Sequence, residues 1–132
     1  MKTSQCGLTV LRVVVGAVFI FHGSLKLFTF GIHGVAGMLG GLHVPLPMVA
    51  ATVVTLVEFF GGIALVLGLF TRWAAALIAI DMLGAIYLVH FKHGFDVSKG
   101  GYEFALTLLG AAVCLALSGP GSLALGGVVG RK

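Results

Sequence analysis

The sequence has very few charged residues. Eight of its 132 residues are lysine or arginine and four are aspartate or glutamate, whereas about a quarter of the residues in a soluble domain are charged. A water-soluble surface cannot be made from so few charges, so a soluble enzyme is excluded. The basic residues, which give a formal net charge of +4, stand singly and never form a run. We therefore expect no nucleic-acid partner.

Cysteine is also scarce. The two cysteines, Cys6 and Cys114, lie far apart in the sequence. They form no C-x-x-C pair and have no metal-ligand spacing. We therefore expect neither dithiol chemistry nor a metal site within this chain.

Apolar residues make up 59% of the chain, and the mean hydropathy is +1.16. Crossing a hydrocarbon core takes about 20 residues as a helix. Four apolar stretches approach this length, the last of them being short for a span: 8–30, 48–70, 73–91 and 103–118. The sequence therefore predicts a single domain over residues 1–132, an all-α polytopic membrane four-helix bundle whose main partner is the lipid bilayer.

The stretches between the predicted spans differ in character. Residues 31–47 are rich in glycine and carry no lysine, arginine or acidic residue, which indicates a connector lying on or dipping into the membrane interface. Residues 92–102 form a polar loop. The link between the second and third spans is so short that these two helices must be antiparallel neighbours. No structure is predicted for the tail, residues 122–132.

The basic residues also predict an orientation. Four spans put five of them on the side of the termini (Lys2, Arg12, Arg72, Arg131 and Lys132) and three on the other side (Lys26, Lys92 and Lys99). Because lysine and arginine are enriched on the cytoplasmic side, we expect both termini in the cytoplasm. No organellar presequence is recognisable, which favours a prokaryotic inner membrane.

Glu58 stands near the middle of the second span. A charge at that depth costs about 2.5–3.5 kcal/mol to insert, so it needs a partner or a purpose. On its helix face, Gly61 and Gly62 allow a neighbouring helix to approach closely. Two interpretations follow: a carboxylate that handles a proton or anchors a ligand, or one that pairs with Arg12, Lys26 or a histidine and fixes helix packing.

Four further polar residues share the half of the membrane opposite the termini. His22 and Lys26 are spaced i, i+4 on one face of the first span, His90 ends the third, and Glu103 begins the fourth. Two histidines on different helices can ligate a haem, but no spacing supports this and we do not expect haem. A histidine with a carboxylate can bind a quinone carbonyl or move a proton. For His22 the alternative is a histidine that is hydrogen-bonded within the bundle.

Other polar positions have simpler interpretations. Arg12 lies near a helix start and can snorkel to phosphates, or pair with an internal carboxylate. Asp81, near the middle of the third span, is either a second buried carboxylate or a partner for a polar group of the first or second helix. A stripe of small and polar residues on the last helix predicts a packing seam with a buried, inert thiol: Glu103, Thr107, Gly110 and Cys114.

Four segments in the same order resemble the DoxX family of small membrane proteins: Arg12 to Leu27, Glu58 to Arg72, His90 to Gly94 and Gly100 to Glu103. The resemblance implies a four-helix membrane protein associated with respiratory or redox enzymes in bacteria and archaea. The polar positions that recur in the family match six residues here, which are our candidate site residues: Arg12, His22, Lys26, Glu58, His90 and Glu103. Asp81 is not part of that pattern.

The function implied is an accessory subunit of a respiratory, quinone-linked oxidoreductase system. No self-contained catalytic motif, flavin fold or haem motif is recognisable, so electron transfer would depend on quinone or on a redox-enzyme partner. Two alternatives stay open: a small solute or proton transporter, and a structural or assembly factor. A homo-oligomer also stays open, because the GxxxG-like spacing of Gly37 and Gly41 lies in a connector and gives no dimer signal.

Overall fold

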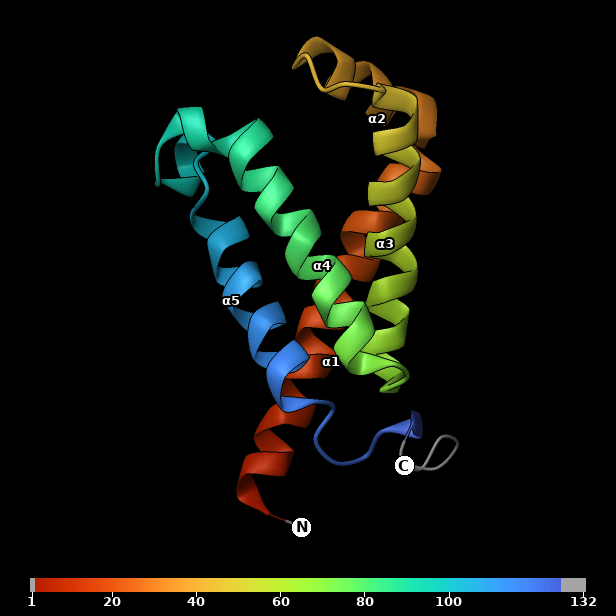
Figure 1. Cartoon of the computed structure of the whole chain (residues 1–132), viewed down its shortest axis with the longest axis vertical. Coiled ribbons are helices and arrows are strands. Elements are labelled where there is room, and N and C mark those ends of the chain that lie inside the picture. Colours follow the sequence, from red (N-terminus) through yellow and green to blue (C-terminus); the bar gives the residue numbers. More distant parts are fainter. Residues whose placement is uncertain (1, 127–132) are drawn as a thin grey trace.

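A computed structural model describes residues 2–126 of the chain, and every regular element in this part is helical (Figure 1). In chain order the elements are α1 (Thr3–Ser24), η1 (Leu25–Thr29), α2 (Gly31–Gly41), α3 (Pro47–Leu67), α4 (Thr71–Ala85), η2 (Ile86–His90), η3 (Phe91–His93), η4 (Val97–Lys99) and α5 (Glu103–Ser118). The segments η1 and η2 are π-helical, and η3 and η4 are short 3₁₀ turns. The all-α fold is confirmed.

Three helical stretches within the described residues are long and apolar enough to cross a membrane: Thr3–Thr29, Pro47–Leu67 and Thr71–His93. The fourth apolar helix, α5, has 16 residues and at 1.5 Å per residue is about 24 Å long. Large apolar side chains point outward from the bundle, among them Phe60 and Trp73. Such a surface is compatible with lipid and not with water, and the chain is a helical membrane bundle.

The predicted connector, residues 31–47, contains a helix, which corrects the prediction from sequence. α2 places apolar residues at i, i+3, i+4 and i+7 (Ile32, Val35, Ala36 and Leu39), and these positions pack with Val44 and Ala51 in a small core of their own. This spacing is typical of an amphipathic helix. The many glycines in the segment concealed it, because glycine disfavours helix interiors in water.

The helix ends follow local backbone chemistry. α3 ends at Leu67 because Gly68 adopts φ 74°, a left-handed conformation that glycine tolerates without strain. α1 begins at Thr3, five residues before the predicted start of the first span. The predicted start was the first residue of the apolar stretch, which marks only the part of the helix expected in lipid. The helix extends further towards the N-terminus because, between Thr3 and Leu8, only Gly7 strongly disfavours a helix.

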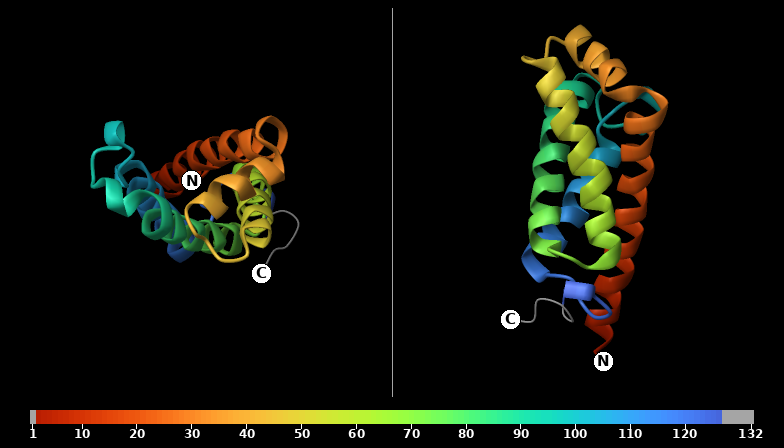
Figure 2. Two further views of the ribbon diagram at one scale, coloured as in Figure 1. Left: turned by 90° about the horizontal axis from the view of Figure 1, so that it is seen from above. Right: turned by 90° about the vertical axis from the view of Figure 1, so that its right-hand side faces the viewer.

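Glycines bring α1 and α3 into close contact. A Cβ placed on Gly16 would lie 2.7 Å from the carbonyl oxygen of Gly62, and one on Gly62 would lie 2.7 Å from the backbone nitrogen of Ile20. The backbones therefore touch where any larger residue would separate them, as the small-residue face around Glu58 predicts. Figure 2 shows α1 and α3 running side by side.

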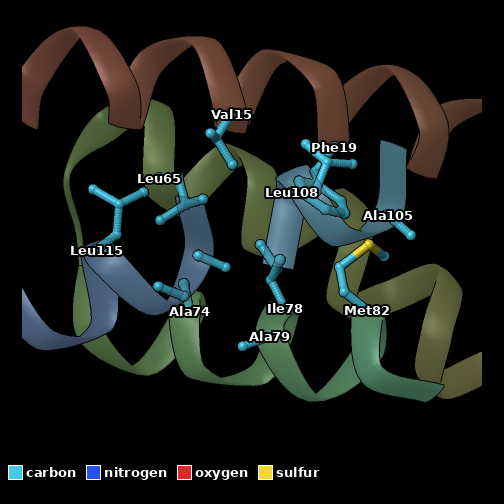
Figure 3. Close-up of a cluster of buried hydrophobic side chains, with 12 residues drawn as sticks. Val15, Phe19, Leu65, Ala74, Ile78, Ala79, Met82, Ala105, Leu108 and Leu115 are labelled. Carbon is cyan, nitrogen blue, oxygen red and sulfur yellow. The ribbon is translucent and has the colours of Figure 1, made fainter. Parts of the chain in front are cut away.

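The main hydrophobic core lies between α1, α3, α4 and α5 (Figure 3). Leu65, Ile78 and Leu115 are fully buried there, and Val15 and Phe19 of α1 close the cluster. α4 and α5 pack against each other along this core. The start of α1 and residues 119–126 lie at one end of the bundle, hereafter the termini end, and α2 lies at the opposite, loop end together with the 91–102 loop (Figure 1).

Candidate functional site

An ion pair joins α1 and α3 on the loop-end side of the core. Lys26, at the π-helical continuation of α1, donates a hydrogen bond to Glu58 Oε1 at 2.8 Å. The side chain of Glu58 is 5% exposed and that of Lys26 is 21% exposed. Of the partners considered for Glu58, the structure therefore selects Lys26.

Asp81 of α4 lies beside the Lys26–Glu58 ion pair. Its carboxyl interacts electrostatically with both Glu58 and Lys26. Its Oδ2 atom is buried and accepts no hydrogen bond from the described residues. Sequence reasoning left Asp81 out of the candidate site because it lies outside the family pattern. The signal that could have included it was its depth, since it stands as near the middle of its span as Glu58 does of its own.

Two histidines flank the three charged groups in similar ways. His22 Nδ1 lies 2.9 Å from the carbonyl oxygen of Val18, and His90 Nδ1 lies 2.9 Å from the carbonyl oxygen of Gly100. Because a carbonyl only accepts, Nδ1 carries the hydrogen in both rings. The other ring nitrogen, Nε2, is then the atom of each histidine that can accept a proton.

The larger of two cavities lies between α2, α3 and α4 and has a volume of about 510 Å³. Its walls are mostly aliphatic, for example Leu39, Val54, Ile80 and Leu88. Its polar lining consists of four residues: Lys26, Glu58, Asp81 and His90. The cavity is thus an apolar chamber with charged and polar groups gathered at one place.

The smaller cavity, of about 290 Å³, lies towards the polar loop. His22, Phe19 and Phe104 contribute to its walls, and Val97, Gly100 and Gly101 of the loop close it. Four residues line both cavities: Lys26, Glu58, Ala85 and His90. The Lys26–Glu58 pair therefore stands where the two cavities meet.

The two π-helical segments carry two of these shared residues. η1 contains Lys26 and η2 ends at His90. π-Helical turns are rare and occur frequently at functional sites. Their coincidence with Lys26 and His90 marks this part of the bundle as the candidate site.

Glu103 begins α5 at the loop end of the bundle, as predicted. It lines neither cavity; its carboxylate oxygen Oε1 accepts a hydrogen bond from the backbone N–H of Val97 at 3.0 Å. Next to it, Gly101 packs directly against the backbone of Gly94 and Phe95, where no Cβ would fit. Tyr102 stacks on Phe91 with ring centroids 5.7 Å apart. These contacts fix the loop that closes the smaller cavity.

Arg12 does not snorkel to the membrane surface, and it pairs with no carboxylate among the described residues, which corrects both predictions. It is 1% exposed and donates only to backbone carbonyls at the termini end. The acceptors are Leu65 and Val66 at the end of α3 and three residues after α5, Pro120, Ser122 and Leu123. The last carbonyls of a helix lack their regular intrahelical partner, and the buried guanidinium donates to two of them at the end of α3.

The predicted packing seam on α5 is also wrong. Thr107, Gly110 and Cys114 are exposed, and a Cβ on Gly110 would meet nothing within 4 Å. α5 instead buries the neighbouring stripe of Ala105, Leu108, Ala112 and Leu115. In water, the hydrophobic effect drives apolar residues inward and leaves polar residues outside. Lipid is itself apolar and gives no such driving force, so the buried face of a membrane helix is harder to assign from sequence.

The remaining observations concern the absence of a metal site among the described residues, three further histidines and the basic residues of the tail. Among residues 2–126, no three histidine, cysteine or acidic side chains gather in a way that could hold a metal ion. His33, His43 and His93 are exposed. Arg131 and Lys132, which contributed to the predicted orientation, lie outside the described residues.

Comparison with known proteins gives a consistent family match. The model of the DoxX family matches residues 7–91. The chain is 36% identical over 124 residues to "Putative oxidoreductase CatD" of Bacillus subtilis (strain 168), covering 94% of this chain and 87% of that protein. It is 30% identical over 125 residues to "Inner membrane protein YphA" of Escherichia coli (strain K12), covering 89% and 86%. No solved structure matches significantly.

Proposed function

The chain belongs to the DoxX family, and from this premise we propose that it is an accessory subunit of a respiratory, quinone-linked oxidoreductase system and holds a quinone between its helices. The observation that carries this proposal is the larger cavity. Its volume of about 510 Å³ falls within the range of about 300–1,000 Å³ that is usual for small-molecule sites.

The chemistry of the cavity matches that of a quinone. A quinone has two carbonyl oxygens that accept hydrogen bonds and an apolar tail that needs an apolar environment. Lys26 gives one N–H to Glu58 and keeps further donors, since an ammonium group has three. The aliphatic walls between α2, α3 and α4 suit the tail.

Electrons for the quinone come, in this proposal, from a partner oxidoreductase. The chain carries no recognisable haem or flavin motif. The name of the Bacillus subtilis relative describes an oxidoreductase, which supports a redox setting for the family. The role of the present chain is then to position the quinone and the protons that the quinone takes up, rather than to carry electrons.

We place the protein in a prokaryotic inner membrane with both termini in the cytoplasm. The Escherichia coli relatives are named as inner membrane proteins, which supports the location. The start of α1 and residues 119–126 lie at the same end of the bundle (Figure 1), as an even number of spans requires. Lys2 and Arg72 are exposed there, in agreement with the enrichment of basic residues on the cytoplasmic side.

A transporter fits the arrangement less well. The two cavities lie on the loop-end side, whereas Leu65, Ile78 and Leu115 fill the bundle towards the termini and are fully buried. Arg12 closes the termini end with its hydrogen bonds to α3 and to the segment after α5. A solute would have to displace this packed core to cross the membrane.

A pair of glycine variants tests the proposal. Gly84 lines the larger cavity, and a Cβ there would meet no atom within 4 Å, so Gly84→Leu is expected to fill the cavity without disturbing the backbone. Gly110 on α5 is equally open but lines neither cavity, so Gly110→Leu is the matched control. Binding of a short-chain ubiquinone or menaquinone analogue to the detergent-purified protein is measured for both.

We expect the wild type and Gly110→Leu to bind the analogue and Gly84→Leu to lose binding by at least about tenfold, because the side chain occupies the space of the ligand. Equal binding by the two variants would contradict the proposed site. If the wild type binds neither analogue, quinone is the wrong ligand. A structural or assembly role would then explain the cluster better.

A further inference from the structure

Where the two cavities meet, acidic groups outnumber basic ones. Glu58 and Asp81 bring two carboxyl groups, and Lys26 brings one ammonium group. A second carboxylate without a partner is costly at this depth, because little water reaches it. Binding one proton removes the excess charge.

The hydrogen bonds indicate which carboxyl lacks a partner. Glu58 accepts the Lys26 ammonium at 2.8 Å. Asp81 lies beside both groups, yet its Oδ2 atom is buried and no described residue donates to it. A buried acceptor without a donor costs about 1–3 kcal/mol, whereas a protonated carboxyl turns one of its oxygens into a donor.

We propose that Glu58 and Asp81 hold one proton between them beside Lys26, and that this proton exchanges with water at the loop end of the bundle through the smaller cavity, by way of His22 and His90. This inference rests on the proposed function in one respect. A quinone in the larger cavity lies against the same carboxyl pair, and the O–H group of the protonated carboxyl donates a hydrogen bond to a quinone carbonyl oxygen.

The smaller cavity supplies the route for the proton. Residues 91–100 are all exposed, and Val97 and Gly100 of this loop line the cavity. His22 and His90 line it too, and His90 also lines the larger cavity. With Nδ1 of both rings bound to a carbonyl, the Nε2 atoms accept and release the proton.

The other helices bring no competing ionisable group to either cavity. α5 contributes Phe104, Ala105 and Leu108 to the smaller cavity, and α2 contributes Val35, Met38 and Leu39 to the larger one. Among the described residues, the titratable groups that face the proton are therefore His22, Lys26, Glu58, Asp81 and His90, one from each of α1, η1, α3, α4 and η2. Glu103 is held by the loop backbone.

Infrared spectroscopy of the purified protein at neutral pH tests the shared proton, because a protonated carboxyl has a C=O band that a carboxylate lacks. We expect one such band in the wild type. It disappears in Asp81→Asn and equally in Glu58→Gln, because in each variant Lys26 neutralises the one carboxylate that remains. In Lys26→Met the band persists or grows, since the cation is gone.

The control is Asp96→Asn, which removes an exposed carboxylate of the loop and leaves the band unchanged. A wild-type spectrum without the band would overturn the shared proton. So would a band that survives in both single carboxyl variants. These outcomes do not depend on quinone: a protein that shows the band and binds no quinone keeps the proton and loses the proposed function.

The route is tested by transfer of the same samples into heavy water, with the shift of the band followed in time. His22→Gln combined with His90→Gln keeps a hydrogen-bond donor at each ring position but removes the titrating nitrogen. We expect isotopic exchange to slow by about tenfold or more, in keeping with the usual contribution of a positioned acid–base group. Exchange as fast as in the wild type would overturn the route through the histidines.

Discussion

Two basic side chains enter the bundle from the first membrane span, and their surroundings differ: Arg12 lies in α1, and Lys26 lies in its π-helical continuation η1. At the termini end, Arg12 is 1% exposed, and its donors are taken up by carbonyl oxygens of α3 and of the segment after α5. At the loop end, Lys26 binds one carboxylate and lines two cavities.

The two basic residues differ in how many of their N–H donors remain available. A guanidinium has five N–H donors in a rigid fork, and here five hydrogen bonds use them on backbone acceptors, so Arg12 has nothing left for a ligand. Lys26 keeps donors and borders open space. In our proposal, Arg12 holds the bundle together, and the functional site comprises Lys26, Glu58, Asp81 and His90.

The largest expected effect is therefore on stability at the termini end. Replacing Arg12 with methionine leaves several carbonyl oxygens without a donor, and each unpaired buried polar group costs about 1–3 kcal/mol. We expect the free energy of unfolding in detergent to fall by about 3 kcal/mol or more. Folded Arg12→Met protein keeps its quinone affinity, because Arg12 lines neither cavity.

Arg72→Met is the matched control for this change. Arg72 also donates to carbonyls at a helix end, those of Ala116 and Leu117, but it is exposed to solvent. Water can replace its hydrogen bonds, so the loss should be below about 1 kcal/mol. Equal losses in the two arginine variants would contradict the structural role assigned to the buried guanidinium.

An intermediate effect is expected at the loop end, in a double-mutant cycle of Lys26→Met and Glu58→Gln. Because the two groups are in direct contact at 2.8 Å, their coupling in the free energy of unfolding should reach about 1–3 kcal/mol. Quinone affinity should fall in Lys26→Met even where the fold survives, since a donor to the ligand is lost. Additive effects on stability, with unchanged affinity, would show that the pair is neither coupled nor part of the site.

The smallest effect concerns the loop that closes the smaller cavity. Hydrogen bonds donated by the hydroxyl and the backbone N–H of Ser98 hold the pKa of Asp96 below its ordinary value of 3.8. Because the folded pKa is the lower one, the stabilisation is present above pH 3.8 and is lost as the pH falls through the folded pKa. When the pH falls through the folded pKa of Asp96, we expect the amides of residues 96–101 to exchange hydrogen faster relative to their intrinsic rates.

Asp96→Asn removes the titrating group, so the acid-dependent step in loop exchange should vanish in this variant. Exchange around Arg12 at the termini end should show no such step in either protein. An acid step that persists in Asp96→Asn would assign the loop's pH dependence to another group.

Much of the fold was predictable from the sequence because lipid imposes simple requirements. Apolar stretches of sufficient length marked α1, α3 and α4, and Gly119 followed by Pro120 marked the end of α5. The helix α2 was missed because five of its eleven residues are glycines, which disfavour helix interiors in water, although its apolar positions keep helical spacing. The outward face of α5 was missed because its stripe of small and polar residues was expected to face the bundle, whereas the stripe of Ala105, Leu108, Ala112 and Leu115 is the buried one.

The site was predictable in part. The cost of charge in lipid identified Glu58 and Lys26, and their helical positions brought His22 and His90 to the same depth. Sequence position alone could not show that Glu103 binds the loop backbone, that Arg12 binds the ends of α3 and α5, or that Asp81 faces Glu58. These facts depend on helix rotation, which the charge pattern leaves undetermined.

The most direct test of a quinone in the larger cavity is photolabelling with a photoreactive quinone analogue in native membranes, followed by mapping of the labelled residues by mass spectrometry. We predict labels on the cavity walls, such as Val54, Ile80 and Leu88, which an excess of unmodified quinone removes. Labels confined to lipid-facing residues such as Phe60 and Trp73, or labels that excess quinone leaves in place, would contradict the account.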